Sequence, residues 1–324
     1  MTTIAVADEA VLLDDPLRLE LGGVIPRCTV GLRRVGDADA PAVLVVGGIS
    51  ATRRVTSLPG DADAGWWDPV VDASRVLSGG AVQLIGADFL AGEGLSSLPD
   101  EADRITTGDQ AEAIARACIA SGIESVDAVV GASYGGMVAL SLAARRPEFV
   151  RRIVAISAAD RSHPMASASR WIQREIVRLG EAAGRSHAGV ALARALAMTT
   201  YRTAEEFHDR FGAGPEGAAR VAEYLAGRGE AFAGRWTAPR FRQLSESLDS
   251  HQVDPSRIPI PVVLVGVTSD TLVPVRQLES LRAALGSGGS LHLLDSPWGH
   301  DAFLKEPAAI ARLIDRSLTS LDQA

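Results

Sequence analysis

The stretch VDAVVGASYGGMVALSLAARR, residues 126–146, decides the fold of this chain. It begins as a short apolar run typical of a buried strand and ends with the composition of a helix. Between the two parts, Ser133 stands among Gly131, Gly135 and Gly136. Small residues around a serine permit the sharp strand-to-helix turn that exposes a nucleophilic hydroxyl, and the following helix directs backbone N–H groups toward it. The stretch predicts a nucleophile elbow at Ser133, against the simpler interpretation of a glycine-rich surface turn.

Short apolar runs alternate with helical patterns on both sides of this elbow. The expected strands cover residues 41–49, 81–89, 126–130, 150–157, 259–267 and 290–296, and the expected helices include residues 108–122 and 275–285. Near-continuous apolar strands joined by helices indicate a parallel sheet that is buried on both faces. We therefore expect an α/β fold with a mostly parallel, doubly wound sheet.

The interval from about 160 to 250 interrupts this alternation, because it holds several helical segments and no convincing strand. It falls between two strands, so it is placed to cover the strand ends where ligands bind in open α/β folds. We expect a helical lid. The chain then divides into residues 1–158 and 252–324, the two parts of the core, and the lid insertion 159–251.

Composition excludes several classes of protein. The net charge is -8, and no segment provides the basic face that a nucleic-acid partner requires. Cys28 and Cys118 lack the spacing of a zinc site or a disulfide framework, so we expect no metal. No apolar run approaches the roughly 20 residues that cross a bilayer, and the start of the chain lacks the features of a secretion signal. We expect a cytoplasmic enzyme without a membrane partner.

A serine at such an elbow needs a base, and the base needs an acid that orients it. In this arrangement the chain order is Ser, then Asp or Glu, then His. Asp270 follows the expected strand 259–267, and His300 follows the expected strand 290–296. The sequence therefore predicts a triad of Ser133, Asp270 and His300, against a turn-forming aspartate and a loop histidine.

The remaining candidates for these two roles are less well placed. The other histidines lie within a strand, in the lid or ahead of the acid: His292, His163, His187, His208 and His251. The weaker candidates for the acid are Asp249, Asp254 and Asp295.

Two backbone N–H groups are needed to stabilise an oxyanion. One is that of Tyr134, directly after the nucleophile, and the other is expected in the loop that follows an early strand. The segment GGIS, residues 47–50, fits this place, and Ile49 is the expected donor. The alternative is that Gly47 and Gly48 only terminate the strand.

Seven segments resemble, in the same order, landmarks of the homoserine O-acyltransferases of α/β-hydrolase fold. These are AGWWD (64–68), GASYGGMVAL (131–140), MTTYR (198–202), VAEYL (221–225), LDSHQVD (248–254), SDTLVP (269–274) and GHDAFLKE (299–306). The resemblance implies transfer of an acetyl or succinyl group from acyl-CoA to the side-chain hydroxyl of homoserine, in methionine biosynthesis. It also implies acyl-CoA as co-substrate with no bound cofactor, and a homodimer built through the lid helices.

The resemblance further implies that Arg202 and Asp301 bind the amino-acid substrate. A guanidinium suits the carboxylate of a zwitterion, and a carboxylate suits its ammonium group. The alternatives are a solvated lid arginine and an aspartate that caps the following helix. Together with the triad, these residues predict a ping-pong mechanism in which Ser133 carries the acyl group.

The chain departs from the family pattern at GGISA, where an H-x-L-T-G type sequence is usual, and at Tyr134, where Met is commoner. We expect both departures to line the acyl pocket, so the choice of acetyl or succinyl, and of homoserine or serine, stays open. Arg53 and Arg54 are candidates for a succinyl carboxylate or the phosphates of coenzyme A, or else a solvated pair. An esterase or thioesterase with the same triad, or a non-catalytic binding module, is the competing interpretation.

Overall fold

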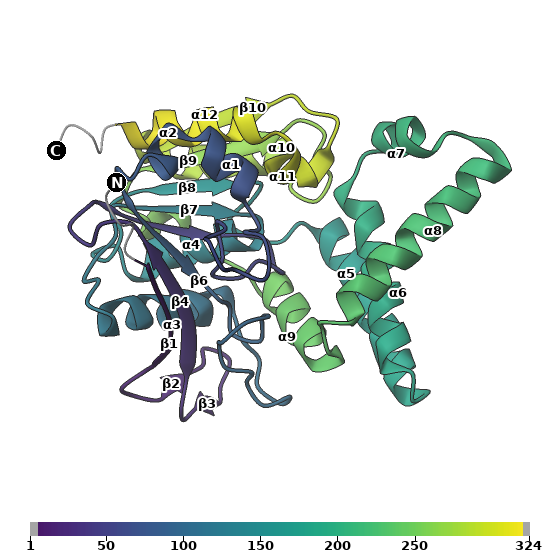
Figure 1. Ribbon diagram of the computed structural model, residues 1–324, viewed down its shortest axis with the longest axis horizontal. Coiled ribbons are helices and arrows are strands. Elements are labelled where there is room, and N and C mark those ends of the chain that lie inside the picture. Colours follow the sequence, from purple (N-terminus) through teal and green to yellow (C-terminus); the bar gives the residue numbers. More distant parts are fainter. Residues whose placement is uncertain (1–5, 320–324) are drawn as a thin grey trace.

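The computed structural model describes residues 6–319. Within them, an eight-stranded sheet forms the centre of the molecule (Figure 1). Its strands are β1 (Val6–Leu12), β4 (Thr29–Val35), β5 (Ala42–Val46), β6 (Gln83–Ala87), β7 (Ala128–Ala132), β8 (Ile153–Ile156), β9 (Val262–Val267) and β10 (Gly289–Leu294). Their spatial order is β1-β4-β6-β5-β7-β8-β9-β10. The six strands β6, β5, β7, β8, β9 and β10, neighbours in this spatial order, are parallel to one another. Strand β4 pairs antiparallel with both β1 and β6.

Side chains of the central strands alternate between two hydrophobic cores, which explains their near-continuous apolar sequences. In β5, Val43 and Val45 enter one core, while Leu44 and Val46 enter the other. A strand buried on both faces has no position left for a polar residue. The expected α/β fold with a mostly parallel, doubly wound sheet is confirmed.

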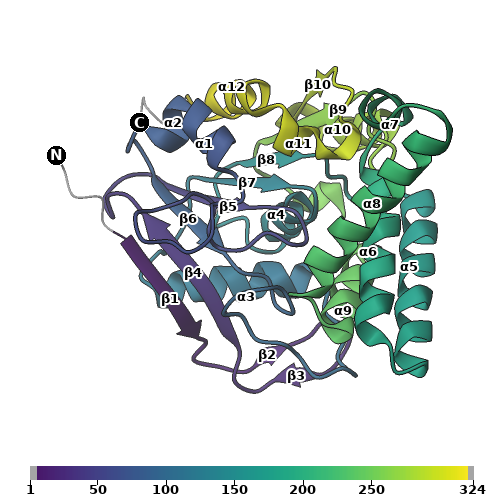
Figure 2. The ribbon, with the colours of Figure 1, turned by 45° about the vertical axis from the view of Figure 1, so that its right-hand side comes forward.

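Helices cover both faces of the sheet (Figure 2). One core is closed by α3 (Thr107–Ala120), α4 (Tyr134–Arg145) and α10 (Val275–Ala284). The opposite core is closed by α1 (Asp68–Ala73), α2 (Arg75–Ser78) and α12 (Pro307–Leu318). The remaining short elements are the ribbon β2 (Leu17–Arg18) and β3 (Val24–Ile25), helix α11 (Ala302–Lys305), and the 3-10 turns η1 (Pro255–Arg257), η2 (Gly286–Gly288) and η3 (Gly299–Asp301).

Five helices between β8 and β9 form a separate layer at one end of the sheet (Figures 1 and 2). They are α5 (Pro164–Ala182), α6 (Ser186–Tyr201), α7 (Ala204–Phe211), α8 (Gly214–Ala233) and α9 (Ala238–Asp249), and we call them the lid. Glycines let α5 and α6 approach closely, because a methyl group on Gly180 would lie 2.8 Å from the Cα of Gly189. Among the described residues, none of the helices is both long and apolar enough to span a membrane.

Strands β1 and β4 were not among the expected strands, which began at residue 41. Both carry charged side chains, which weaken the apolar pattern that identifies a buried strand. The charges are compensated only once the strands pair. Arg33 of β4 forms ion pairs with Asp8 of β1 and with Asp61, and Arg34 forms one with Glu9.

Candidate active site

Ser133 lies at the tip of the turn between β7 and α4. Its backbone has φ 53° and ψ −119°, a conformation that costs energy for any residue with a side chain. The glycines around it allow this turn, because a methyl group on Gly131 would overlap the carbonyl of Gly135, and one on Gly135 would overlap the carbonyl of Val46. The N–H of Ser133 donates a hydrogen bond of 2.8 Å to the carbonyl of Ile156. The elbow is thereby fixed to the neighbouring strand.

The three residues of the expected triad come together in one hydrogen-bonded chain. The Ser133 Oγ lies 2.7 Å from Nε2 of His300, and Nδ1 of His300 lies 2.7 Å from Oδ2 of Asp270. The other oxygen of Asp270 accepts hydrogen bonds from the N–H groups of Leu272 and Val273 at 2.8 and 3.1 Å. An ionised carboxylate only accepts, so Nδ1 carries a proton and Nε2 is free to accept that of Ser133.

Burial and charge act in opposite directions on His300. Burial of the imidazole alone would lower its pKa, but the charge and hydrogen bond of Asp270 outweigh burial and raise the pKa above its ordinary value. The site therefore favours the imidazolium that forms when His300 accepts a proton. This is the behaviour expected of a general base that must accept and then release a proton.

The two expected oxyanion donors belong to the residue after the nucleophile and to the loop after β5. Tyr134 is the first residue of α4, so its N–H has no acceptor within the helix. Ile49 belongs to the loop after β5 and lines the same cavity as Ser133. The N–H of Gly135 donates to the carbonyl of Gly47 at 2.8 Å, which holds this loop against the elbow.

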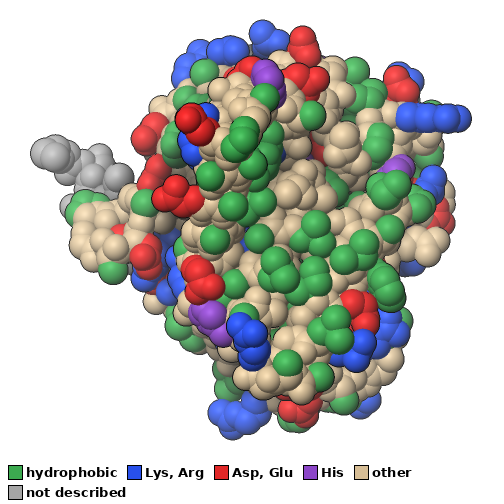
Figure 3. Space-filling view, turned by 90° about the vertical axis from the view of Figure 1, so that its right-hand side faces the viewer, with side chains coloured by type: hydrophobic (Ala, Val, Ile, Leu, Met, Phe, Trp, Pro, Cys, Tyr) green, Lys and Arg blue, Asp and Glu red, His purple; other side chains and the backbone are tan. Residues whose placement is uncertain are grey.

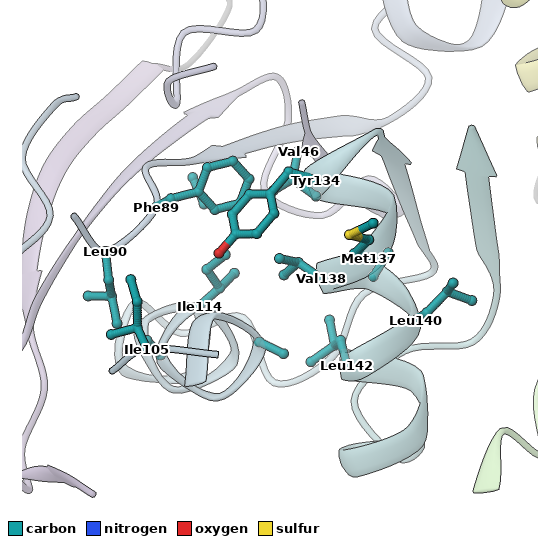
Figure 4. Packing of buried hydrophobic residues seen from close by; sticks show 14 of the residues in the cluster. Val46, Phe89, Leu90, Ile105, Ile114, Tyr134, Met137, Val138, Leu140 and Leu142 are labelled. Carbon is teal, nitrogen blue, oxygen red and sulfur yellow. The ribbon is translucent and has the colours of Figure 1, made fainter. Parts of the chain in front are cut away.

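The side chain of Tyr134 does not line the acyl pocket, contrary to expectation. Its ring is fully buried on the α3 side of the sheet and meets the ring of Phe89 edge-on, with 4.8 Å between centroids (Figure 4). The hydroxyl lies 2.6 Å from Oγ of Ser247, and burial raises the pKa of the phenol. The orientation of α4 directs this side chain into the core. The presence of Tyr134 where the family commonly has Met therefore alters the packing behind the site.

A cavity of about 220 Å³ opens in front of Ser133 and His300. The core contributes the loop after β5 and the ring of Trp66, and the lid contributes one face each of α5 and α6. Trp66 is fixed by a 3.0 Å hydrogen bond from its indole N–H to the carbonyl of Thr52. Trp67, stacked on it, donates at 2.9 Å to the carbonyl of Phe303. The AGWWD segment thus joins the oxyanion loop to the segment that carries His300.

Asp301 follows His300 and contacts Arg202, which is not itself among the residues that line the cavity. Asp301 lines the cavity, and its Oδ2 accepts a hydrogen bond of 2.6 Å from Nε of Arg202. Nη1 of Arg202 donates to Oε1 of Glu206 at 2.9 Å. Nη2 makes no hydrogen bond to any residue between 6 and 319. Asp301 and Glu206 therefore hold the guanidinium of Arg202 in a fixed orientation, and this side chain is buried, so it is not a solvated lid arginine.

Arg53 and Arg54 do not line the cavity. Arg53 is buried, and its guanidinium forms ion pairs with Asp8 and, at 3.0 Å, with Asp88. Arg54 lies 3.5 Å from Asp63. The expectation that they meet a succinyl carboxylate or coenzyme A phosphates is therefore not supported by their positions. Both are positioned by carboxylates from other segments.

The arginines that do line the cavity were not singled out from the sequence: Arg161, from the segment before α5, and Arg170 and Arg194, from the lid. A signal was present in the polar positions of α5, since Ser169, Arg170 and Gln173 follow one another at helical spacing. That face is solvent-exposed in an isolated helix. Only the packing of the lid on the core turns it into a cavity wall.

The competing histidines and acids have other partners. His251 is buried between Oγ1 of Thr107 and the carbonyl of Ala159, at 2.7 and 2.9 Å. Asp249 pairs with Arg170 and Arg174. His187 pairs with Glu230, Asp254 caps η1, and Asp295 accepts from Thr268. None of these five residues contacts Ser133 or His300 within the described chain.

The fold and the site define an enzyme of the α/β-hydrolase class: it has a doubly wound sheet, a strained serine elbow and a hydrogen-bonded chain of Ser133, His300 and Asp270. The family model for the alpha/beta hydrolase fold matches residues 82–307. A homoserine O-succinyltransferase of Xanthomonas campestris pv. campestris is 43% identical over 289 residues, covering 88% of this chain and 77% of that protein. A homoserine O-acetyltransferase of Mycolicibacterium smegmatis is 33% identical, covering 93% and 90%. The chain belongs to the homoserine O-acyltransferase family.

A solved structure supports the fold. The crystal structure of a homoserine O-acetyltransferase from Staphylococcus aureus superposes with a TM-score of 0.81 and covers 97% of this chain and 95% of that one. The two chains are 23% identical, so this likeness concerns the arrangement of the elements.

Proposed function

We propose that this enzyme transfers an acyl group from acyl-CoA to the side-chain hydroxyl of L-homoserine by a ping-pong mechanism on Ser133. The observation that carries the proposal is the continuous hydrogen-bonded chain from Ser133 through His300 to Asp270 at the base of a cavity roofed by the lid. This chain supplies a nucleophile, a base and an orienting acid. The lid supplies a space in which a second substrate competes with water.

In the first half-reaction, Oγ of Ser133 attacks the thioester carbonyl carbon while Nε2 of His300 takes the hydroxyl proton. The N–H groups of Tyr134 and Ile49 stabilise the oxyanion. The carbon–sulfur bond then breaks, and the leaving thiolate takes the proton from His300. The product is a Ser133 ester and free coenzyme A.

In the second half-reaction, the homoserine hydroxyl oxygen attacks the ester carbonyl as His300 accepts its proton. The bond from the acyl carbon to Ser133 Oγ breaks, and this oxygen regains the proton from His300. Asp301 binds the ammonium group of the amino acid, and Nη2 of Arg202 binds its carboxylate. These contacts place the acceptor hydroxyl where water would otherwise attack.

Succinyl-CoA is the donor we favour over acetyl-CoA. The relative that is 43% identical carries the name of a succinyltransferase, while the one at 33% carries that of an acetyltransferase. The product is then O-succinyl-homoserine, an activated ester that suits methionine biosynthesis in the cytoplasm.

A homodimer built through the lid is part of the same proposal. The lid carries large apolar side chains that the single chain leaves exposed, and the space-filling view from the lid side shows hydrophobic groups spread over this face (Figure 3). They are Met165, Trp171, Ile172, Leu179 and Leu192. Exposed apolar surface of this kind is typical of a protein interface. Light scattering of the purified protein measures its molar mass in solution, which distinguishes a dimer from a monomer.

The test is to identify products by mass spectrometry when succinyl-CoA or acetyl-CoA is offered with homoserine, with serine or with buffer alone. We expect O-succinyl-homoserine as the main product, formed faster than free succinate. Ser133→Ala should lower kcat by on the order of 10⁴- to 10⁶-fold. Release of free acid at the same rate with and without homoserine would instead identify a thioesterase.

A further inference from the structure

The lid side of the cavity is lined by residues of α5, α6, α8 and α9. On α6 the cavity-lining residues are Arg194, Ala197, Thr200 and Tyr201, spaced so that they share one side of the helix. Arg194 stands at the end of this row. Of these four residues of α6, Arg194 alone carries a positive charge.

The three arginines that line the cavity differ in their partners. Arg161 lies 2.8 Å from Asp160, and Arg170 lies 2.7 Å from Asp249. Arg194 has no carboxylate partner within residues 6–319. Instead, its guanidinium lies over two aromatic rings, 5.3 Å from the centroid of Tyr201 and 4.8 Å from that of Phe232. Aromatic faces orient a guanidinium without neutralising its charge.

Arg194 and Ser133 line the same cavity and are linked by a series of contacts. The ring of Tyr201 that it covers lies 6.0 Å from the ring of His300, and His300 contacts Ser133 at 2.7 Å. A four-carbon dicarboxylic acyl group spans at most about 4 Å between its carbonyl and carboxylate carbons, because its three carbon–carbon bonds of about 1.5 Å meet at tetrahedral angles. Because Ser133 and Arg194 line one cavity, an acyl group on Ser133 extends into the space that the α6 wall bounds.

We propose that Arg194 binds the distal carboxylate of a dicarboxylic acyl group and so selects succinyl-CoA over uncharged thioesters. This inference rests on the proposed acyl transfer and adds the residue that determines the donor. A guanidinium fork binds a carboxylate through two parallel hydrogen bonds, and it is least hydrated against aromatic rings. The enclosed wall strengthens this attraction relative to water.

The surroundings of Arg194 fit an acyl carboxylate better than an amino acid. A zwitterion also needs an anion for its ammonium group, and that anion, Asp301, is paired with Arg202. The α6 wall near Arg194 offers aromatic faces and the hydroxyl of Tyr201 at 3.5 Å, with no carboxylate. A ligand with a single negative end matches this site.

The experiment compares kcat/KM for succinyl-CoA and for butyryl-CoA, which has the same four-carbon chain without the carboxylate. In Arg194→Met we expect the ratio of the two values to fall by about 10- to 100-fold, the range for losing a hydrogen bond to a charged group. Arg194→Lys should retain part of the ratio because it keeps the charge. As a matched control, Arg178→Met removes an exposed arginine that is paired with Glu175 on the same lid, and should leave the ratio unchanged.

The outcomes separate this inference from the proposed function. A ratio in Arg194→Met equal to that of the wild type would overturn the role of Arg194, even if homoserine is acylated normally. A wild-type enzyme that prefers butyryl-CoA or acetyl-CoA would overturn it as well. Failure of the wild type to acylate homoserine from every thioester would instead reject the proposed function.

Discussion

His300 depends on Asp270 for both its orientation and its basicity. The 2.7 Å contact with Oδ2 fixes the proton on Nδ1, and the negative charge offsets the burial that would otherwise keep the imidazole neutral. Two backbone N–H groups hold Asp270 in place from the other side. The order of the triad in the sequence predicted these three residues, because each follows the end of a strand of the parallel sheet.

The acidic limb of the pH profile reports the pKa of His300. Transfer needs the neutral imidazole, so a raised pKa means that kcat/KM falls with acidification around a value above the ordinary 6.5 or so. Asp270→Asn removes the charge that raises this pKa, which should shift the limb to lower pH and reduce kcat by about 10⁴-fold. Steady-state rates from pH 5 to 9 check both effects. An unshifted limb in the variant would contradict the role of Asp270.

His251 is a structural histidine with the opposite shift. Burial lowers its pKa to about 4. The unfolded chain takes up this proton near pH 6.5 and the folded chain does not, so stability is full above pH 6.5 and is lost as pH falls toward 4. The loss from this group should reach about 3 kcal/mol. Urea unfolding of wild type and His251→Gln at a series of pH values measures it, and parallel pH dependences would disprove the assignment.

Among the elements, the lid depends on a close approach of α5 and α6. Gly180 and Gly189 face each other at the crossing, where a side chain would meet backbone atoms. The cavity wall uses the same two helices, so their separation sets the position of Arg170 and Arg194. Close packing through small residues therefore links the stability of the lid to the shape of the acyl site.

Gly180→Ala should separate the two helices. The new methyl group lies 2.8 Å from the Cα of Gly189, so backbone must move, at a cost of about 1 to 3 kcal/mol in unfolding free energy. Gly227→Ala in α8 is the control. Its methyl group meets nothing within 4 Å, and Ala is favoured over Gly in a helix by up to about 1 kcal/mol, so this variant should be at least as stable as wild type. Equal stability of the two variants would contradict the packing account.

The elements differ in how far the sequence predicts them. The six parallel strands have uncharged runs, and five of them are largely buried, so their local pattern identifies them; β10 lies at the edge of the sheet and is partly exposed. Strands β1 and β4 contain Asp8, Glu9, Arg33 and Arg34, which are compatible with a strand only after they pair across the sheet. Arg53 is a similar case. Its carboxylate partners stand 45 and 35 positions away in the sequence, so its burial follows from the tertiary fold alone.

At the scale of the whole molecule, the site lies where the core meets the lid. The core supplies Ser133, Asp270 and His300, and the lid supplies Arg194 and Arg202. Asp301 of the core and Arg202 of the lid form the ion pair that joins the two beside the triad. The lid arginines that line the cavity, Arg170 and Arg194, were the less predictable part of the site, because their place depends on how the lid is seated.

Replacing Arg202 should separate the two half-reactions. Arg202→Lys keeps a charge near Glu206 and Asp301 but loses the fork that we propose binds the amino-acid carboxylate. We expect a higher KM for homoserine and more hydrolysis of the acyl-enzyme, with an unchanged burst of coenzyme A release. Stopped-flow detection of the thiol, with and without homoserine, measures each step. A reduced burst with unchanged homoserine dependence would place Arg202 in the donor site instead.

The central claim is that Ser133 carries the acyl group between the two substrates. Rapid-quench mass spectrometry of the protein, both intact and after proteolytic digestion, following mixing with succinyl-CoA tests it most directly. We predict a gain of one acyl mass on the peptide that contains Ser133, absent in Ser133→Ala, and its disappearance with stoichiometric O-succinyl-homoserine when homoserine is added. Transfer to homoserine at the normal rate by Ser133→Ala, with the wild-type protein never acylated, would contradict the account.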